Sequence, residues 1–400
     1  MNANIQHLYH IAQKPVRRIL GLMSGTSLDG LDMALCSFQD SGPHTTVTVT
    51  HFETYPFEET FKEEIRQIFA KKEIDFLQLC VLHPWIGQMH GQIILQTLSK
   101  WNIDPTEVDC IASHGQTVFH APIWLHGLPK FPNATLQIGD GDHMAQTTGI
   151  LTLSDFRQKH CAAGGEGAPL AVYGDYLLFS KENENRILLN MGGIANFTFL
   201  PATLEPNDVF ATDTGTGNTL LDAFVQKTWG EPYDKDAHLA RQGTVSQPLL
   251  TQLKKHPFFD QSFPKTTGPE LFNLTYLDEA LQTIHEIPTD QDILATLVHF
   301  SADTIVDAIE KMRHKLPEGF PTVLYASGGG MHNPLLMECI RKQLPDFALY
   351  PLNDLGISGD AKEAVLFATL ANEALVGGKT NFGTRQGVPS VSMGKISFPN

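Results

Sequence analysis

The feature that most constrains the fold is a pattern that occurs twice in the chain. Residues 19–35 consist of an apolar run, a turn of small residues, and a second run in which apolar and small residues dominate. Residues 186–200 repeat this pattern around Gly192-Gly193, and Arg-Ile-Leu occurs at the start of both, at residues 18–20 and 186–188. Two such runs joined by a short glycine-containing turn are typical of a β-hairpin. The sequence therefore predicts a duplicated structure in which each half begins with a glycine hairpin.

The tip of the first hairpin carries many hydrogen-bond donors. Gly25 and Gly30 are expected to adopt positive φ and to leave backbone N–H groups uncovered, and three hydroxyls stand beside them. Asp29 would repel an anion held there unless a divalent cation lay between the carboxylate and a phosphate. The tip therefore predicts a metal–nucleotide site. An ordinary tight turn uses the same residue types, so a purely structural role remains the alternative.

Length and charge limit the classes of protein to consider. A chain of 400 residues with 42% hydrophobic content predicts two domains, an N-terminal one over 1–150 that residues 385–400 join, and a C-terminal one over 151–384 with an insertion near 227–290. Lys and Arg number 28 against 44 Asp and Glu, and this net charge of −16 argues against nucleic acid or an acidic membrane as partner. Five cysteines without CxxC spacing favour a reducing cytoplasm, and no apolar run is long enough to cross a membrane.

Strand-like and helix-like segments alternate through the first half, which predicts an α/β sheet. A long helix over 76–99 is expected to break near Pro84. Ligands of such sheets bind at the carboxyl ends of strands, so the segment 113–117 with His114 and Gln116 is a candidate site loop. Arg157 could bind a carboxylate with two parallel hydrogen bonds. The alternatives are an ordinary loop histidine and a structural ion pair.

In the second half, Asp213 follows the apolar segment 209–212 and precedes two glycines and a helix over 219–226. A carboxylate held at a strand end can act as a general base, and this is the functional interpretation of Asp213. The alternative is that Asp213 caps the following helix. Three consecutive glycines at 328–330 follow another buried strand. They would let a flat ring such as adenine lie against the backbone, and the alternative is a tight strand-to-helix turn.

Together these motifs resemble the superfamily of sugar kinases, heat-shock ATPases and actin, and within it the anhydro-N-acetylmuramic acid kinase family. The matching segments occur in family order over nearly the whole chain: Ser24–Gly30, His114–Thr117, Asp155–Arg157, Gly164–Leu170, Asn190–Asn196, Asp213–Asn218 and Ser327–Pro334. The resemblance implies two duplicated actin-like, ribonuclease H-like α/β domains with a nucleotide cleft between them.

It also implies a cytoplasmic, homodimeric, Mg²⁺-requiring enzyme of peptidoglycan recycling. Such an enzyme uses ATP to open the 1,6-anhydro ring of anhydro-N-acetylmuramic acid and to phosphorylate the freed 6-hydroxyl, giving N-acetylmuramic acid 6-phosphate and ADP. By resemblance, Asp213 is the base, Glu363 a supporting acid and Asp29 the metal-binding residue. The nucleotide is assigned to Ser24, Gly25, Thr26, Ser27, Asp29, Gly192, Gly193, Asn196, Gly328, Gly329, Gly330 and Asn333, and the sugar to His114, Gln116, Arg157, Gly215 and Asn218.

The chain departs from the family pattern at four positions in or near the sugar-contacting segments. His160, Glu166, Thr216 and Pro269 stand where Asp, Gln, Pro and Arg are usual. Two other functions therefore stay open: a related kinase that phosphorylates an ordinary hydroxyl, and a non-catalytic sugar-binding protein or regulator of the ATPase fold. No helix-turn-helix segment or basic stripe supports a regulator. Analysis of the phosphorylated product would separate the three.

Overall fold

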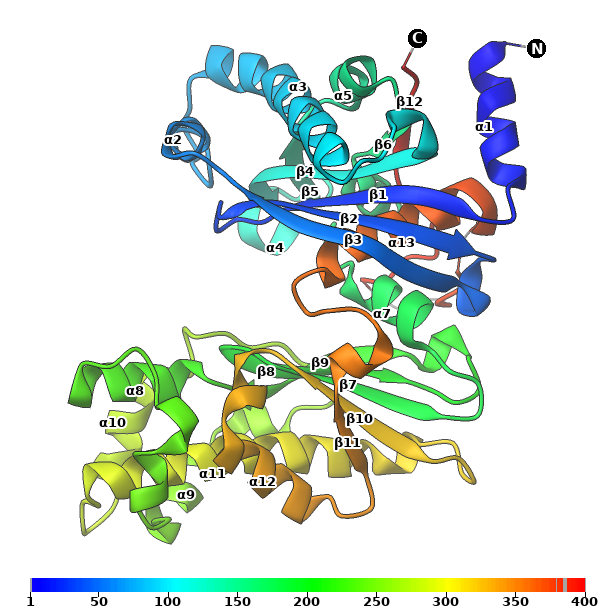
Figure 1. Ribbon diagram of the computed structural model, residues 1–400. Helices are drawn as coiled ribbons and strands as arrows, with labels where there is room; N and C mark the ends of the chain where they lie inside the picture. The colour runs from blue at the N-terminus through cyan, green and yellow to red at the C-terminus, as the bar shows by residue number, and fades with distance from the viewer. Residues whose placement is uncertain (1, 379, 384–386, 400) are drawn as a thin grey trace. The chain divides into compact units, whose positions relative to one another are not determined.

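The computed structural model describes residues 2–378, 380–383 and 387–399. The chain forms two compact units: unit 1 comprises Met1–Phe179 and Gly356–Asn400, and unit 2 comprises Ser180–Leu355. Each unit is built on one β-sheet with helices packed against it (Figure 1).

The sheet of unit 1 is mixed. Its strands are β1 (Arg17–Ser24), β2 (Gly30–Gln39), β3 (Thr46–Pro56), β4 (Cys110–Ala121), β5 (Ala134–Ile138), β6 (Thr152–Ser154) and β12 (Lys395–Ser397). They are ordered β12-β6-β4-β1-β2-β3, and β5 pairs with β4. The strand β2 runs antiparallel to both neighbours, whereas β1, β4 and β6 are parallel to one another.

The sheet of unit 2 repeats this arrangement. Its strands are β7 (Asn185–Met191), β8 (Ile194–Leu200), β9 (Phe210–Thr216), β10 (Thr322–Ser327) and β11 (Ala348–Pro351), in the order β11-β10-β7-β8-β9. Numbered from its first strand, the sheet of unit 2 has the order 3-2-1-4-5, and unit 1 has the same order with β6 in the fifth place, because β5 lies off this path. The second strand is antiparallel in both sheets. This ribonuclease H-like topology in both units confirms the predicted fold class.

Helices cover both faces of the sheet in unit 1 (Figure 1). The helices of unit 1 are α1 (Ala3–Gln13), α2 (Glu59–Arg66), α3 (Phe76–Lys100), α4 (Ile123–His126), α5 (Gly141–Thr148), α6 (Phe156–Ala162), α7 (Ala171–Phe179) and α13 (Lys362–Asn372). The predicted break near Pro84 is wrong, because α3 continues through it. Packing overrides the local cost of proline there: the backbone N–H of Asp140 bonds the His83 carbonyl, and Gly87 lets α3 approach Asp140 closely.

The helices of unit 2 are α8 (Thr219–Trp229), α9 (Gln247–Leu253), α10 (Leu274–Gln282), α11 (Asp290–Met312) and α12 (Pro334–Gln343). The long helix α11 is amphipathic, and its buried face contributes fifteen residues to the interior. A capping box formed by Thr289 and Asp292 fixes its first turn. The segment 227–290, predicted as an insertion, folds into α9, α10 and short 3₁₀ turns that pack in this core.

The helix α13 lies directly on β1 because Gly21 has no side chain. A Cβ at Gly21 would stand 1.9 Å from the Ala364 carbonyl oxygen, and a Cβ at Gly174 of α7 would stand 2.3 Å from the Leu366 side chain. The chain therefore returns to unit 1 at Gly356, and β12 then pairs with β6. The structure places the unit boundaries at 179/180 and 355/356 rather than at the predicted 150/151 and 384/385.

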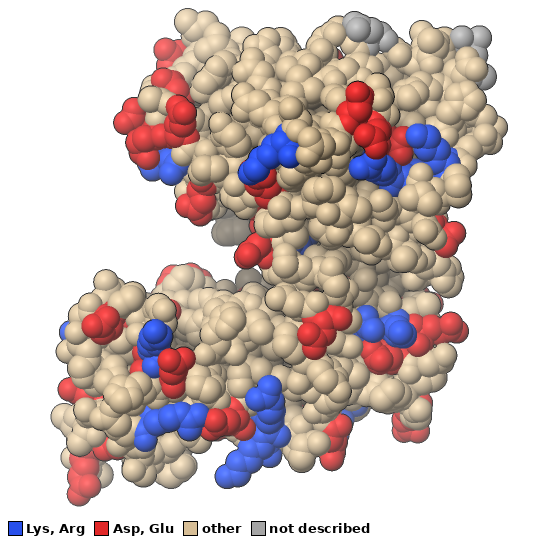
Figure 2. Space-filling view, viewed as in Figure 1, with Lys and Arg blue, Asp and Glu red and all other residues tan. Residues whose placement is uncertain are grey.

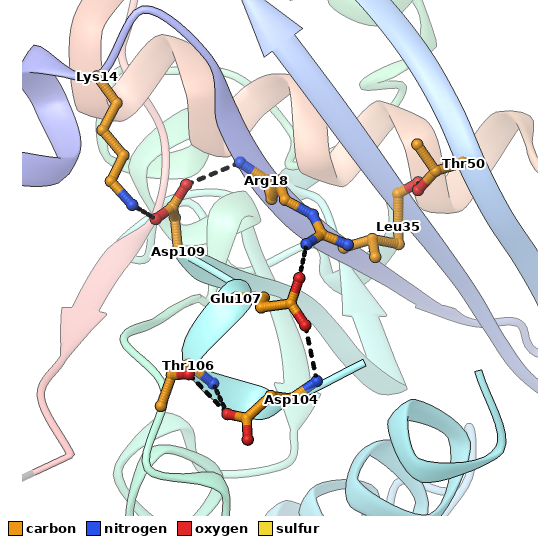
Figure 3. Close-up of polar contacts among 8 residues, drawn as sticks. All are labelled: Lys14, Arg18, Leu35, Thr50, Asp104, Thr106, Glu107 and Asp109. Atoms are coloured by element: carbon orange, nitrogen blue, oxygen red, sulfur yellow. Dashed lines mark hydrogen bonds and ion pairs between the residues drawn. The ribbon is translucent and has the colours of Figure 1, made fainter. Parts of the chain in front are cut away.

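The start of β1 is fastened by ion pairs (Figure 3). The backbone N–H of the half-buried Arg18 donates to Asp109 Oδ2 at 2.8 Å, and Lys14 Nζ donates to Asp109 Oδ1 at 2.5 Å. The Arg18 guanidinium pairs with Glu107 at 2.6 Å. The Asp109 side chain is only 5% exposed, so these partners neutralise a carboxylate that burial would otherwise destabilise.

Positive and negative side chains lie near each other on the face shown in Figure 2. The ion pairs of the described residues include Arg18–Glu107 and Arg241–Glu338. Among the helices of the described ranges, none has the length and apolar character needed to cross a membrane.

We predict that Gly21→Ala destabilises the protein. The added methyl group would collide with the α13 backbone, which cannot yield as a flexible side chain would, and overpacking of this kind costs about 1–3 kcal/mol of unfolding free energy. Urea denaturation followed by circular dichroism measures the loss. The control is Gly359→Ala, since no neighbouring atom lies within 4 Å of a Cβ there. Equal stability of the two variants would contradict the packing argument.

Candidate functional site

Unit 2 presents a row of polar side chains across four adjacent strands. Ser327 of β10 pairs with Asn190 of β7, Asn190 pairs with Asn196 of β8, and Asn196 pairs with Asp213 of β9. Residues opposite each other on neighbouring strands share one face of a sheet. All four are half-buried, although most of their neighbours along these strands are buried. We call Ser327, Asn190, Asn196 and Asp213 the polar row.

Asp213 ends this row in an environment suited to proton transfer. Its Oδ2 accepts a hydrogen bond of 2.8 Å from the backbone N–H of Thr267. Burial raises the pKa of the carboxyl group, and the Thr267 bond opposes that shift. A carboxylate with a raised pKa is a stronger base than an exposed one.

The position of Asp213 differs from the expected strand end. It lies inside β9 next to a register shift opposite Asn196, and Asn218 occupies the N-cap position of α8. The hydrogen bond of the Asp213 side chain goes to Thr267 rather than to the first turn of α8. The helix-cap interpretation of Asp213 is therefore wrong.

The glycine-containing turns of unit 2, at residues 192–193, 215–218 and 328–330, lie in contact with one another. The backbone N–H groups of Gly217 and Asn218 bond the carbonyls of Gly193 and Gly192 at 2.9 and 2.8 Å. Gly328 has φ +82°, and a Cβ on it would lie 2.7 Å from the Met191 backbone. The structure thus brings together the predicted nucleotide residues of the hairpin and of the 328–330 turn.

A cavity of about 390 Å³ opens beside this point. Asn218, Gly329 and Asn333 line it together with the apolar side chains of Leu221, Leu294 and Val298 and the segment Tyr233–Asp236. An apolar wall with a few polar groups at its rim is the usual form of a small-molecule site. The sequence indicated the polar members, whereas the apolar wall comes from α8 and α11 and carries no local motif.

In unit 1 the tip of the first hairpin has a different backbone from the predicted one. Neither Gly25 nor Gly30 adopts positive φ, and Leu28 does so instead, at +60°. Gly30 is required because a Cβ would stand 2.4 Å from the Tyr55 carbonyl oxygen. Ser24 is buried at the start of the tip, while Thr26, Ser27 and Asp29 are exposed.

Carboxylates near this tip affect the pKa of Asp32 and of Glu363, and we call Asp29, Asp32, Asp360 and Glu363 the acidic group. Burial raises the pKa of Asp32, and the charges of Asp360 and Asp29 raise it further against a 2.6 Å hydrogen bond from Thr54. Desolvation also raises the pKa of Glu363 at the first turn of α13. The expected metal residue Asp29 and the expected acid Glu363 thus belong to one electrostatic group.

Arg157 contributes a positive charge beside the acidic group. Burial lowers the pKa of its guanidinium, while Glu363 opposes that shift. Arg157 Nε donates to His114 Nε2 at 2.9 Å, and its Nη1 donates to the Gly167 carbonyl at 2.7 Å. Burial and Arg157 lower the pKa of His114 to about 3, so the ring is neutral at physiological pH.

The predicted loop at 113–117 is instead part of the twelve-residue strand β4. Hydrogen bonding explains the difference, because β4 pairs with β1 and with β5 across these residues. The buried Gln116 side chain contacts Ser24 Oγ and donates to the Gly25 carbonyl at 3.3 Å. Gln116 therefore supports the hairpin tip, and His114 supports Arg157.

The four departures from the family pattern lie in different surroundings, and three of them form hydrogen bonds. His160 is buried, and its Nδ1 accepts the Gly167 N–H at 2.9 Å. Glu166 accepts from Trp124 Nε1 at 3.3 Å, Thr216 is buried in β9, and the Pro269 carbonyl accepts from Asn273. Two of them therefore lie close to residues assigned to the sugar: His160 shares the glycine segment with Arg157, and Thr216 follows Gly215.

Three residues near the predicted sites were missed in the sequence. Asp32 lies in an apolar strand pattern where a polar residue stands out, which was the available signal. Thr267 and Lys265 approach Asp213 from 54 and 52 positions away along the chain, and no local pattern connects them.

Comparison with known proteins gives concordant matches. A model of the family described as anhydro-N-acetylmuramic acid kinase matches residues 17–397. Proteins of that name from Pseudoalteromonas atlantica and Pseudoalteromonas translucida are 54% and 50% identical over 409 and 402 residues, with 100% of each chain covered. One solved structure, the activator of the 2-hydroxyisocaproyl-CoA dehydratase from Clostridium difficile with bound ADPNP, is 10% identical, with 89% of this chain and 96% of that chain covered at a TM-score of 0.36.

We predict that Asp213→Asn stabilises the fold in a pH-dependent way. Because the folded-state pKa of Asp213 is raised, the folded protein binds this proton more tightly than the unfolded chain does. The parent therefore loses stability as pH rises from about 4, the ordinary carboxyl value, through the raised one. Asn carries no charge and avoids this loss.

The measurement is the melting temperature of parent and variant between acidic and neutral pH. The variant is expected to melt higher at pH 7, with a difference that shrinks toward acidic pH. Asp208→Asn, at an exposed position just before β9, is the control and should follow the parent. A difference that stays constant with pH would contradict the assigned environment of Asp213.

Proposed function

The chain belongs to the anhydro-N-acetylmuramic acid kinase family, whose role is in peptidoglycan recycling, and we propose how its residues divide the work of that kinase. The observation that carries the proposal is the half-buried Asp213 carboxylate with one backbone hydrogen bond and a raised pKa. In the proposal Asp213 is the catalytic base and the remaining site residues hold the two substrates.

The proposed reaction couples ring opening to phosphoryl transfer. Asp213 takes a proton from the water that attacks the anomeric carbon, and the bond between that carbon and the bridging oxygen breaks. The released oxygen on carbon 6 attacks the γ-phosphorus of ATP, and ADP leaves. The oxygen of the water thus becomes the anomeric hydroxyl, and the former bridging oxygen on carbon 6 carries the phosphate.

The nucleotide is assigned to the glycine turns and the cavity of unit 2. The apolar wall of Leu221, Leu294 and Val298 offers a surface for an adenine ring, and Asn333 offers a polar group at its rim. The hairpin residues Gly192 and Gly193 are assigned to the phosphates, since a side chain there would cover their backbone. Ser24 to Ser27 of the first hairpin are assigned to the same phosphates.

Magnesium fits this chain only together with a nucleotide. No cluster of three or more candidate ligands stands at metal-binding spacing among the described residues. Mg²⁺ characteristically uses one or two carboxylates and completes its shell with phosphate oxygens and waters. The exposed Asp29 in the acidic group meets that requirement, and a bound cation would supply charge neutralisation for the phosphates.

The sugar is assigned to Arg157 and its neighbours. The neutral His114 fixes the guanidinium orientation through a 2.9 Å bond, which leaves the Arg157 charge available for the lactyl carboxylate of the substrate. Glu363 lies near enough to Arg157 to raise the pKa of its guanidinium, and this proximity supports the assignment of Glu363 as an acid beside the sugar. Gly215 and Asn218 are assigned to the sugar on the side of Asp213. A homodimer and a cytoplasmic location stay predictions.

Product analysis tests the activity itself. The protein is incubated with ATP, Mg²⁺ and anhydro-N-acetylmuramic acid, and the product mass is determined. Ring opening coupled to phosphorylation adds one phosphoryl group and one water molecule to the mass of the sugar. Phosphorylation of an ordinary hydroxyl adds the phosphoryl group alone. A product without the added water would favour the ordinary kinase, and no product would favour a binding protein.

We predict that Asp213→Asn loses about a hundredfold to ten-thousandfold in kcat, the range that general-base assistance supplies. The amide still accepts the Thr267 hydrogen bond, so the fold and much of the substrate affinity should remain. Steady-state kinetics on the anhydro sugar, together with calorimetric binding of the sugar and nucleotide, provide the measurement. Near-parental kcat in a folded variant would remove Asp213 from the mechanism.

We predict that Asp29→Asn weakens the response to magnesium. Loss of one direct carboxylate ligand should raise the Mg²⁺ concentration for half-maximal activity, by at least the roughly 10-fold to 100-fold that loss of a residue hydrogen-bonded to a metal ligand typically costs. The control is Glu63→Gln, which removes an exposed charge from α2 in the same unit. If both variants titrate with Mg²⁺ like the parent, the metal assignment of Asp29 is wrong.

A further inference from the structure

The free edge of β9 is covered by a segment that follows far along the chain. Because β9 is the last strand of its sheet, one of its edges has no neighbouring strand within the sheet. Lys265 and Thr267 take that place: the Lys265 N–H bonds Thr212 Oγ1 at 3.1 Å, and the Asp213 N–H bonds the Lys265 carbonyl at 3.0 Å. The Thr267 N–H then reaches the Asp213 carboxylate. The environment of Asp213 thus depends on how firmly this segment is held.

The Lys265 side chain provides an anchor for the segment. It is 7% exposed, and its ammonium donates to the carbonyls of Phe258 and Phe259 at 2.9 and 3.4 Å. The same nitrogen lies 4.2 Å from the centre of the Phe258 ring and 5.7 Å from that of Phe263. Carbonyl oxygens and aromatic faces both attract a cation, and the attraction is stronger when water is excluded.

The charge of this anchor is retained at neutral pH. Burial and the nearby Lys311 lower the pKa of Lys265 to about 8, while Asp260 raises it. A buried ammonium of this kind costs free energy unless its hydrogen bonds are satisfied. A lysine that only filled space here would be replaced without loss by an apolar side chain of similar length.

We infer that Lys265 is a positioning residue for Asp213: its anchored side chain holds the segment against β9 so that the Thr267 N–H orients the Asp213 carboxylate. This inference rests on the proposed role of Asp213 as the base. The contact is indirect, since Lys265 reaches the carboxylate only through the backbone that it holds. Loss of the anchor would release the Thr267 bond, leaving the carboxylate less fixed and more readily protonated.

The test compares Lys265→Met, which removes the charge at similar length, with Lys265→Arg, which keeps it. Kinetics are measured with ATP and anhydro-N-acetylmuramic acid across a range of pH. For Lys265→Met, kcat should fall about 10-fold to 100-fold, the range for loss of a hydrogen bond to a charged group. The acidic limb of its plot of kcat against pH should move to higher pH by on the order of one unit. KM for ATP should stay within about twofold of the parent value. Lys265→Arg should restore both.

A second variant, Thr267→Pro, removes the same N–H while leaving Lys265 in place. It should reproduce the upward shift of the acidic limb, and it keeps the test available if Lys265→Met fails to fold. In an Asp213→Asn background, Lys265→Met should cause no further loss of kcat, because both changes act on one group.

The outcomes separate the inference from the function on which it rests. If Asp213→Asn loses kcat while Lys265→Met lowers kcat equally at every pH, the inference is wrong and Asp213 remains the base. An additive loss in the double variant overturns the inference in the same way. If Asp213→Asn keeps parental kcat, the proposed base is wrong and the inference falls with it.

Discussion

The close contact between Gly21 and α13 is the constraint on which unit 1 depends. Because residue 21 has no side chain, the Ala364 carbonyl can lie where a Cβ would otherwise stand, and α13 rests on the middle of the sheet. This packing returns the C-terminal part of the chain to the unit that the N-terminal part begins. It also places Glu363, in the first turn of α13, near Asp32 and Arg157. The electrostatic interactions of Glu363 therefore depend on the absence of a side chain at residue 21.

Unit 2 obtains its site from register rather than from one close contact. The polar row crosses four strands because pairing places Ser327, Asn190 and Asn196 side by side, and Asp213 completes it. Since side chains alternate between the two faces of a strand, a shift of one residue in any pairing would move a member of the row to the other face. The buried apolar residues between these positions hold the register, so the hydrophobic core of unit 2 determines the geometry of the site.

The two units handle charge differently. In unit 1, burial and neighbouring carboxylates raise the pKa of Asp32 and of Glu363, and Arg157 opposes the shift of Glu363. In unit 2, burial acts on Asp213 and a backbone N–H opposes it. A bound cation would relieve the repulsion among the carboxylates of unit 1, and Arg157 would pair with an anionic sugar, whereas Asp213 keeps a strengthened affinity for a proton. This division is consistent with the proposed assignment of metal to unit 1 and general base to unit 2.

The sequence by itself determined the duplication, the family and the two glycine hairpins, because each depends on local patterns or on motifs in a fixed order. Tertiary structure decided what those residues contact. Strand pairing placed His114 inside β4, and neighbouring backbone required Gly30 while Leu28 took the positive φ. The partner of Asp213 comes from 54 residues away, and the apolar wall of the cavity comes from two helices with no motif. Local patterns specify secondary structure and chemistry, whereas burial, register and long-range hydrogen bonds exist only once the chain has folded.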